Sequence, residues 1–368
     1  MNRVKTVCHV VGARPNFMKL SPVYRSMLAS TQIKQLIVHT GQHYSDNMSN
    51  IFFAQLNLPE PSVNLKTGLG DHVHQISDIM NRFDNFLVDS APDMVLLYGD
   101  VNSTLAAALV CAKNNIPVAH VEAGLRSFDR TMPEEINRVL TDQISDLLFT
   151  PSVDGNENLI REGKDAKKIF LVGNVMIDCI MQFLKETEEN PAALSGHVSP
   201  YIEKKQYSVL TLHRPSNVDS SEKLGKILSE IIKISHQVPV IFPIHPRTEH
   251  NLKACDLTFP NTFILCEPLG YIEFLFLLRN AKFVITDSGG IQEETTYLNI
   301  PCLTLRENTE RPITITCGTN TLIGEDFPKF HREVEKILNG SYKQSSMPPY
   351  WDGHSSERIA HIINVYLQ

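Results

Sequence analysis

The chain has 368 residues, 42% of them hydrophobic and 20% charged, which is typical of a globular protein with more than one core, so we expect two domains. The formal net charge of −7 gives no basic surface for nucleic acid, although local arginines can still bind an anionic substrate. Seven cysteines are dispersed singly, which predicts reduced thiols in the cytoplasm rather than disulfides or a zinc site. The first apolar run predicts a strand, and no run is long enough to span a membrane, so we expect neither a signal peptide nor a membrane partner.

The first half of the chain alternates apolar strand patterns with helical ones. The predicted strands are Val4–Val11, Gln35–His39, Met94–Tyr98, Pro117–Val121 and Leu147–Thr150, the last being the expected final strand of this half. Helices are predicted over Asn16–Ala29 and His72–Val88 and from near Ser103. Repeated βα units predict a parallel, doubly wound sheet, whose ligands bind at the carboxyl ends of the strands.

The periodic pattern loosens between about Asn174 and Lys205, where a charged stretch is followed by one rich in loop residues. We place the domain join there. The expected domains are therefore residues 1–173 and residues 174–354, both Rossmann-like. The final helix, within residues 355–368, is expected to pack back on the first domain.

A second βα series follows the join. Its predicted strands are Tyr207–Leu212, Val238–Ile244, Phe263–Leu265, Phe283–Ile285 and Pro301–Leu305. Helices are predicted over Ser221–His236 and Phe274–Leu278 and from Ile291. The fold class is therefore α/β throughout.

The stretch from Val284 to Arg311 combines a strand, the Ser288-Gly289-Gly290 turn, a helix and a second strand. Two glycines allow close approach of a ligand to the backbone, and the free N–H groups of a helix N-terminus favour phosphate. Glu293 and Glu294 follow in what we expect to be the first helical turn, where an acid can accept hydrogen bonds from ribose hydroxyls. The alternative is a tight turn with acids that complement the helix dipole.

Polar residues collect directly after the predicted strands. They are Arg14, Lys19, His43, Asp100, Glu122, Arg126, His213, Arg214, His245, Ser288–Glu294 and Glu307–Arg311. In a two-domain α/β fold such ends can face each other across one cleft. Taken singly, Asp100 could cap the next helix, and His213 or His245 could be a loop histidine with an ordinary hydrogen-bond partner.

Thr131 and Glu134 have the spacing of a capping box around Pro133, which offers a structural role for Glu134. Glu134 and Arg138 lie four residues apart on one expected helix and can pair. The same arrangement can hold a carboxylate beside a bound anion.

Seven motifs occur in an order that resembles the non-hydrolysing UDP-N-acetylglucosamine 2-epimerases. They are GARPNFMKLSPV (12–23), TGQHY (40–44), GDVNST (99–104), HVEAGLRSFDRTMPEEINR (120–138), HR (213–214), DSGGIQEE (287–294) and RENTERP (306–312). The resemblance extends from about residue 4 to residue 324. It implies two Rossmann-like domains facing a central cleft, the glycosyltransferase-B type of fold, and a homodimer.

The resemblance also implies roles for individual residues. Arg14 and the Ser288-Gly289-Gly290 turn would contact the diphosphate, Glu294 the ribose and Phe274 the uracil. Lys19, Arg138, His245 and Arg311 would complete the substrate-binding set. The implied catalytic residues are Asp100, Glu122, Glu134 and His213.

The implied reaction interconverts UDP-N-acetylglucosamine and UDP-N-acetylmannosamine for surface polysaccharide synthesis. UDP is eliminated to give 2-acetamidoglucal and then added back, with a proton delivered to the other face of carbon 2. A base and an acid must reach opposite faces, so more than one titratable group is expected. No cofactor or metal is required, and the first turn, GARPNF, is not the GxGxxG pattern of nicotinamide-binding folds.

The sequence departs from the family pattern at two places. His213-Arg214-Pro215-Ser216-Asn217 stands where relatives have His-Arg-Arg-Glu-Asn. Gln42-His43 is present, but Thr67-Gly68-Leu69-Gly70-Asp71 replaces the arginine-rich stretch that accompanies it in allosteric members. The alternatives are a 2-epimerase of a UDP-2,3-diacetamido sugar, a hydrolysing 2-epimerase, a glycosyltransferase of the same fold, and a non-catalytic nucleotide-sugar sensor.

Overall fold

The computed structural model describes residues 3–42, 53, 55–68, 70–189, 206–244, 246–255 and 257–368, with the backbone alone at residues 14, 186–189, 246 and 247. The chain forms two compact units: Met1–Cys179 with Pro349–Gln368, and Ile180–Pro348. The domain limits expected from the sequence, after residues 173 and 354, lie a few residues from these divisions.

The first unit is built on a seven-stranded sheet with the strand order β3-β2-β1-β4-β5-β6-β7. Every neighbouring pair is parallel, and the order is that of a Rossmann sheet with one added strand. The strands are β1 (Lys5–Val11), β2 (Ile33–His39), β3 (Val63–Asn64), β4 (Met94–Tyr98), β5 (Val118–Val121), β6 (Leu147–Thr150) and β7 (Ile169–Leu171).

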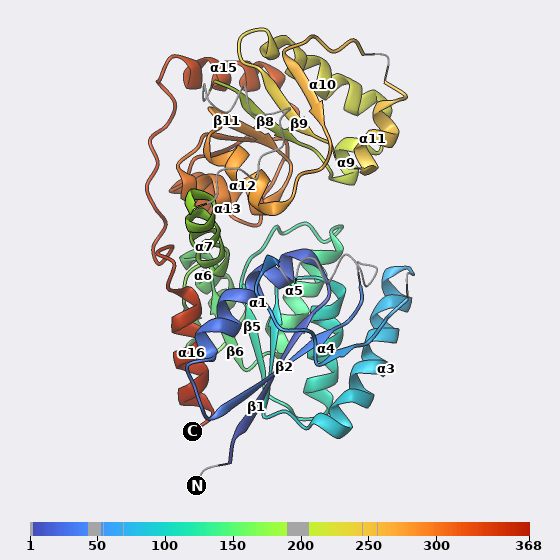
Figure 1. The fold of residues 1–368 in the computed structure, drawn as a ribbon, viewed down its shortest axis with the longest axis vertical. Helices are drawn as coiled ribbons and strands as arrows, with labels where there is room; N and C mark the ends of the chain where they lie inside the picture. The colour runs from blue at the N-terminus through green and yellow to red at the C-terminus, as the bar shows by residue number, and fades with distance from the viewer. Residues whose placement is uncertain are drawn as a thin grey trace. The chain divides into compact units, whose positions relative to one another are not determined.

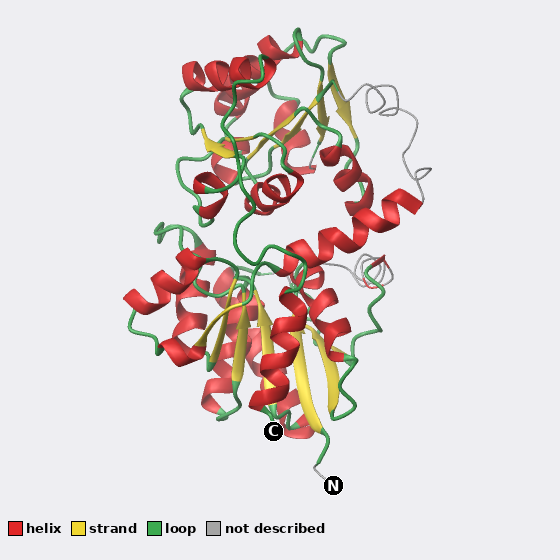
Figure 2. Ribbon diagram, turned by 90° about the vertical axis from the view of Figure 1, so that its left-hand side faces the viewer, coloured by secondary structure: helices red, strands yellow, loops and turns green. Residues whose placement is uncertain are grey.

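Helices cover both faces of this sheet (Figure 1, Figure 2). They are α1 (Arg14–Met27), α3 (His72–Ser90), α4 (Asn102–Lys113), α5 (Pro133–Ile144), α6 (Val153–Arg161), the 3₁₀ turn η1 (Ala166–Lys168) and α16 (Ser355–Tyr366), with α7 (Val175–Glu189) crossing into the second unit. In α3 the buried Gln75, Ile79, Phe83 and Leu87 recur every four residues, which is the stripe of a helix lying on a sheet.

The last segment of the chain returns to the first unit, where α16 packs beside α1 (Figure 1). The buried Trp351 donates its indole N–H to the carbonyl of Pro151 at 2.9 Å. Asp178, at the start of α7, accepts hydrogen bonds from the amide groups of Ser355 and Ser356. These contacts fasten both chain crossings between the units to the same side of the first one.

The second unit has a six-stranded sheet of order β10-β9-β8-β11-β12-β13, again parallel throughout. Its strands are β8 (Ser208–Thr211), β9 (Val240–Pro243), β10 (Phe263–Cys266), β11 (Phe283–Thr286), β12 (Cys302–Thr304) and β13 (Asn320–Leu322). Its helices are α9 (Pro215–Val218), α10 (Ser221–Ser235), α11 (Pro246–Leu252), α12 (Tyr271–Arg279), α13 (Gly289–Leu298), α14 (Ile313–Thr316) and α15 (Phe327–Leu338). This order, too, is that of a Rossmann sheet.

The α/β class and the βα alternation are confirmed in both units. The expectation that Leu147–Thr150 is the last strand of the first half is wrong, because one further strand, the three-residue β7, pairs with it at the edge of the sheet. Helix α13 begins at Gly289 rather than at Ile291. In the described part of the chain, no helix is both long and apolar enough to cross a membrane.

Candidate active site

Each sheet reverses its strand order at one point, and the expected site residues follow the strands at these points. In the first unit the reversal lies between β1 and β4, which are followed by the Gly12 turn and by Gly99-Asp100. In the second it lies between β8 and β11, which are followed by His213 and Ser288. Ligands of open α/β sheets bind at such switch points.

The turn after β1 is held by Asn16, which is 1% exposed. Its side-chain oxygen accepts from the amides of Gly12 and Ala13 at 3.2 and 3.1 Å, and its amide group donates to the carbonyl of Tyr98 at 2.7 Å. Asn16 therefore ties the first turn to the end of β4. Arg14 begins α1, and its side chain lies outside the described residues.

Lys19 and Glu122 form a buried ion pair, with side chains 7% and 6% exposed. Both side-chain tips lie against Gly99, where a Cβ would approach the Lys19 nitrogen to 2.9 Å. Glu122 has a φ of +76°. This left-handed conformation is unfavourable for any residue other than glycine, and residues that adopt it are often found at functional sites. The strained backbone at the end of β5 thus places the Glu122 carboxylate beside Gly99 and Lys19, at the switch point.

Asp100 pairs with Arg138, whose side chain is 3% exposed. Arg138 also contacts Glu135 at 2.5 Å. The residue before α4 that takes the N-cap position is Val101, without a side-chain cap. The alternative in which Asp100 caps this helix is therefore wrong, because its carboxylate is engaged by α5 instead.

Glu134 is half-buried and makes neither a hydrogen bond nor an ion pair with the residues that the structure describes. The N-cap of α5 is Met132, and no side chain caps this helix. The Thr131 hydroxyl donates to Asp129 at 2.6 Å. The expected capping box is wrong, because the helix begins at Pro133, one residue later than a Thr131 N-cap would require. The expected Glu134–Arg138 pair is also wrong, because Arg138 pairs with Glu135 instead.

In the second unit, the buried Asp287 organises the turn after β8. Its carboxylate accepts from the backbone N–H groups of His213 and Arg214 and from the Asn217 amide group, and it contacts Nδ1 of His213 at 2.8 Å. Burial would raise the pKa of Asp287, but the hydrogen bond and charge of His213 hold it below its ordinary value. The His213 ring, 42% exposed, is thereby fixed in orientation by an ionised carboxylate.

The Ser288-Gly289-Gly290 turn packs against a cluster of buried charges. A Cβ on Gly289 would lie 2.6 Å from both Arg311 and Glu310, so a larger residue there would displace the ends of these two buried side chains. Arg311 contacts Glu293 at 2.8 Å, and Glu310 accepts from Arg306 at 2.7 Å. A Cβ on Gly290, by contrast, would meet no described atom within 4 Å, which leaves room for a ligand at the helix start.

Glu294 is 5% exposed and accepts from the Tyr271 hydroxyl at 3.3 Å. Because α13 begins at Gly289, Glu293 and Glu294 lie beyond its first turn, and the alternative in which they serve the helix dipole is wrong. Phe274 on α12 is half-buried and packs against the core of this unit. His245 lies outside the described residues.

The structure thus groups Lys19, Asp100, Glu122 and Arg138 in the first unit, and His213, Ser288, Gly289 and Arg311 in the second. Sequence reasoning assigned no role to Asp287, Glu135, Glu310 or Arg306. Asp287 had a signal, since it directly follows a strand and precedes the glycine turn. Glu135 had none, because adjacent glutamates look equivalent until the helix phase is known.

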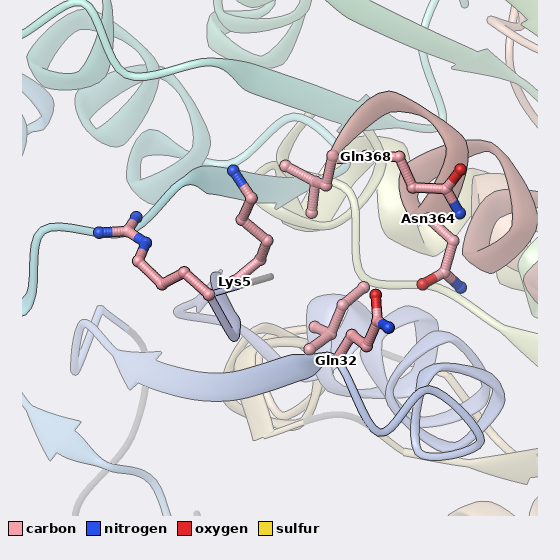
Figure 3. A pocket seen from close by; sticks show the side chains of 7 residues that line it. Lys5, Gln32, Asn364 and Gln368 are labelled. Carbon is pink, nitrogen blue, oxygen red and sulfur yellow. The ribbon is translucent and has the colours of Figure 1, made fainter. Parts of the chain in front are cut away.

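A separate cavity of about 240 Å³ opens at the amino ends of β1 and β2 (Figure 3). This is the sheet edge opposite the switch point, and the cavity contains none of the expected site residues. Its lining residues are Arg3, Lys5, Gln32, Ile33, Asn364, Leu367 and Gln368.

Two Rossmann-like units, each built on a parallel sheet, define a protein of the glycosyltransferase-B type. The same fold appears in a lipopolysaccharide outer core galactosyltransferase at a TM-score of 0.57 and 12% identity, with 98% of this chain and 99% of that one covered. Residues 25–364 match the family described as UDP-N-acetylglucosamine 2-epimerase. The chain belongs to that family.

Its relatives cover it almost completely. A UDP-N-acetylglucosamine 2-epimerase of Methanocaldococcus jannaschii is 47% identical over 361 residues, or 96% of this chain and 97% of the relative. A UDP-2,3-diacetamido-2,3-dideoxy-D-glucuronate 2-epimerase of Pseudomonas aeruginosa is 39% identical, with coverages of 95% and 97%. The crystal structure of the M. jannaschii UDP-GlcNAc 2-epimerase in complex with UDP-GlcNAc and UDP superposes with a TM-score of 0.87 at 44% identity, over 98% and 99% of the two chains. The resemblance inferred from the motifs, the fold type and the isomerase class are confirmed by these matches.

Proposed function

We propose that this protein interconverts UDP-N-acetylglucosamine and UDP-N-acetylmannosamine by eliminating UDP and adding it back. The observation that carries the proposal is the pair of ion pairs at the switch point of the first unit, the buried Lys19–Glu122 and the partly exposed Asp100–Arg138. These contacts place two carboxylates at the carboxyl ends of neighbouring strands, where they can serve as the acid and base groups that a proton transfer at carbon 2 needs.

The second unit supplies the proposed UDP site. The open start of α13 at Ser288-Gly289-Gly290 offers amide groups to the diphosphate, and Arg311 adds positive charge beside the turn. Glu294 would accept hydrogen bonds from the ribose hydroxyls, and Phe274 would border the uracil. Arg14 and His245 complete the proposed substrate-binding set as expectations from the sequence.

The reaction balances without an external reactant. A base removes the proton from carbon 2, the electron pair forms the double bond to carbon 1, and the bond from carbon 1 to the phosphate oxygen breaks as UDP leaves. The reverse addition places a proton on the other face of carbon 2. Asp100, Glu122, Glu134 and His213 are the proposed acid and base groups, and the arginines stabilise the charge that develops on the diphosphate.

The substrate is the point at which close relatives differ. The P. aeruginosa relative is named for a diacetamido uronic acid, whereas the M. jannaschii relative is named for UDP-N-acetylglucosamine and is the more similar of the two. We therefore favour the simpler sugar. Incubation with UDP-N-acetylglucosamine alone in deuterated water tests this directly: we expect a mixture of both epimers labelled at carbon 2. Free N-acetylmannosamine with UDP would indicate a hydrolysing enzyme, and neither epimer nor exchange would leave a transferase or a sensor.

We further propose a cytoplasmic homodimer. None of the seven cysteines forms a disulfide, and Cys8, Cys111, Cys179 and Cys302 are buried, which suits a reducing compartment. Ile136 and Leu140, four residues apart on α5, are 42% and 44% exposed and form an apolar stripe that a second subunit could cover. Analytical ultracentrifugation should give twice the mass of the chain, 41.5 kDa; a single subunit mass at micromolar concentration would refute the dimer.

A further inference from the structure

His120 lies on β5, two residues before Glu122, and is completely buried. Its Nδ1 is 2.7 Å from an Asp142 carboxylate oxygen on α5, and its Nε2 is 2.8 Å from the carbonyl oxygen of Gly99. The ring therefore spans from its own strand to the end of β4, where Asp100 follows.

Both partners of this ring are acceptors. A backbone carbonyl oxygen can only accept a hydrogen bond, so Nε2 must donate. The Asp142 carboxylate also forms an ion pair with Arg126 at 2.7 Å and accepts a hydrogen bond from the amide of Gly124 at 3.0 Å. Both of these groups can only donate, and the guanidinium charge of Arg126 stabilises the ionised form of the Asp142 carboxylate. An ionised Asp142 accepts as well, and both ring nitrogens then carry protons.

The network connects the two turns that hold the proposed catalytic acids. Through Asp142, helix α5 binds the His120 ring and the amide of Gly124, and through the ring it binds the carbonyl of Gly99. One helical turn earlier, Arg138 of the same helix binds the Asp100 carboxylate. The position of Asp100 is thus set twice by α5, once through its side chain and once through the preceding carbonyl.

We propose that His120, buried between two acceptors, carries a proton on each ring nitrogen and acts as a positioning residue, holding Gly99 and thereby Asp100 and Glu122 in their reactive arrangement. This inference rests on the proposed epimerase function for its kinetic consequence, but not for the protonation of the ring. His120 touches no substrate in this scheme. Its two hydrogen bonds join helix α5 to the turn that carries Asp100.

His9 provides a control within the same sheet. It is also fully buried, but its ring contacts the Tyr98 hydroxyl at 2.7 Å and the Gln35 side-chain oxygen at 3.0 Å. A hydroxyl can donate or accept, so a neutral ring satisfies both contacts. Burial lowers the pKa of His9 to about 4, so it is neutral at pH 7. The two histidines share burial and sheet and differ in charge and in contact with the turn backbone.

Nitrogen-15 NMR of the histidine-labelled wild-type protein at pH 7 tests the protonation state without any activity. We expect two ring N–H protons for His120, assigned as the signals that His120→Gln removes, and one for His9, assigned with His9→Asn. A single N–H proton on His120 would overturn the charged ring, because one of the two contacts would then lack its donor or Asp142 would carry the proton.

Kinetics of two His120 variants test the positioning. The Asn amide nitrogen takes the place of Nδ1, so His120→Asn keeps the bond to Asp142 and loses Gly99, whereas His120→Gln reaches Gly99 and loses Asp142. We expect kcat to fall about a hundredfold in His120→Asn, as for a small misplacement of reacting groups, and clearly less in His120→Gln. UDP affinity and KM should change little in either.

His9→Asn, with a comparable loss of stability, should retain kcat within about threefold of wild type, because destabilisation alone leaves the site geometry of the folded molecules intact. Equal kcat losses in His9→Asn and His120→Asn would overturn the positioning role, as would a His120→Asn variant with wild-type kcat. If His120→Asn does not fold, His120→Gln takes its place: because it loses the Asp142 contact, it should lower kcat more than His9→Asn does, and an equal loss in the two would overturn the positioning role. A wild-type protein without epimerase activity would instead refute the proposed function, and the NMR result would still stand by itself.

Discussion

The adjacent residues Glu134 and Glu135 allow a sharp test, because the structure gives them different surroundings. Glu135 is 2% exposed, accepts from the amides of Ser127 and Phe128 at 2.9 Å each, and pairs with the buried Arg138. Glu134 is half-buried and has no such partner among the described residues. Replacing each by glutamine removes one charge and keeps the shape.

The expected magnitudes follow from these contacts. Breaking a buried ion pair costs about 3–5 kcal/mol, and because Arg138 keeps Asp100 as a partner we expect about 3 kcal/mol for Glu135→Gln. In a unit of this size that lowers the melting temperature by about 6–12 °C. Glu134→Gln should change stability by less than about 0.5 kcal/mol, but should reduce epimerisation and carbon-2 exchange about a hundredfold or more.

The assay is epimerisation in deuterated water, with calorimetric melting and UDP titration on the same preparations. Glu135→Gln is the control for stability, and Glu134→Gln is the test of catalysis. Turnover of Glu134→Gln close to wild type would remove Glu134 from the catalytic set, which would then consist of Asp100, Glu122 and His213. A Glu135→Gln protein that melts like wild type would refute the account of the buried network.

Three further changes have defined outcomes. Glu294→Ala should weaken UDP binding by roughly 1–3 kcal/mol through lost ribose hydrogen bonds, and unchanged affinity by calorimetry in a folded variant would exclude Glu294 from the site. Asp287→Asn should lower kcat about a hundredfold or more by releasing the His213 ring from its orientation, while UDP affinity stays close to wild type; a proportionate loss of both would indicate general damage to the turn instead. The pKa of Asp142 is below its ordinary value of 3.8, so its contribution to stability is complete above about pH 5 and is lost as the pH falls through the lower, folded-state pKa. Asp142→Asn should therefore flatten the acid side of the stability curve in urea unfolding between about pH 5 and pH 3, and an unchanged slope would contradict the ionised carboxylate.

The sequence was sufficient for the fold type and for most long elements because these depend on local periodicity and on glycine turns. It missed β3, β7 and β13, of two or three residues each, because so short a run has no period. Site residues were predictable where they follow strands, as Asp100 and His213 do. The roles of Asp142 and Glu135 were not, since each depends on which side chain a distant element presents. The start of α5 lies one residue later than the sequence suggested, and Glu135 rather than Glu134 therefore pairs with Arg138.

The return of the chain to the first unit makes the second unit, Ile180–Pro348, an insertion within the first rather than a successor to it. Asp178 and Ser356 are joined by hydrogen bonds of 2.9 Å, so the two ends of the insertion enter and leave at neighbouring points. A fragment ending at Cys179 would lack α16 and leave the buried face of α1 uncovered. A chain in which a short glycine-rich linker joins Cys179 directly to Pro349 would keep α16 and its contact with α1. The first unit should therefore be isolated by deleting the insertion, not by truncating the chain at Cys179.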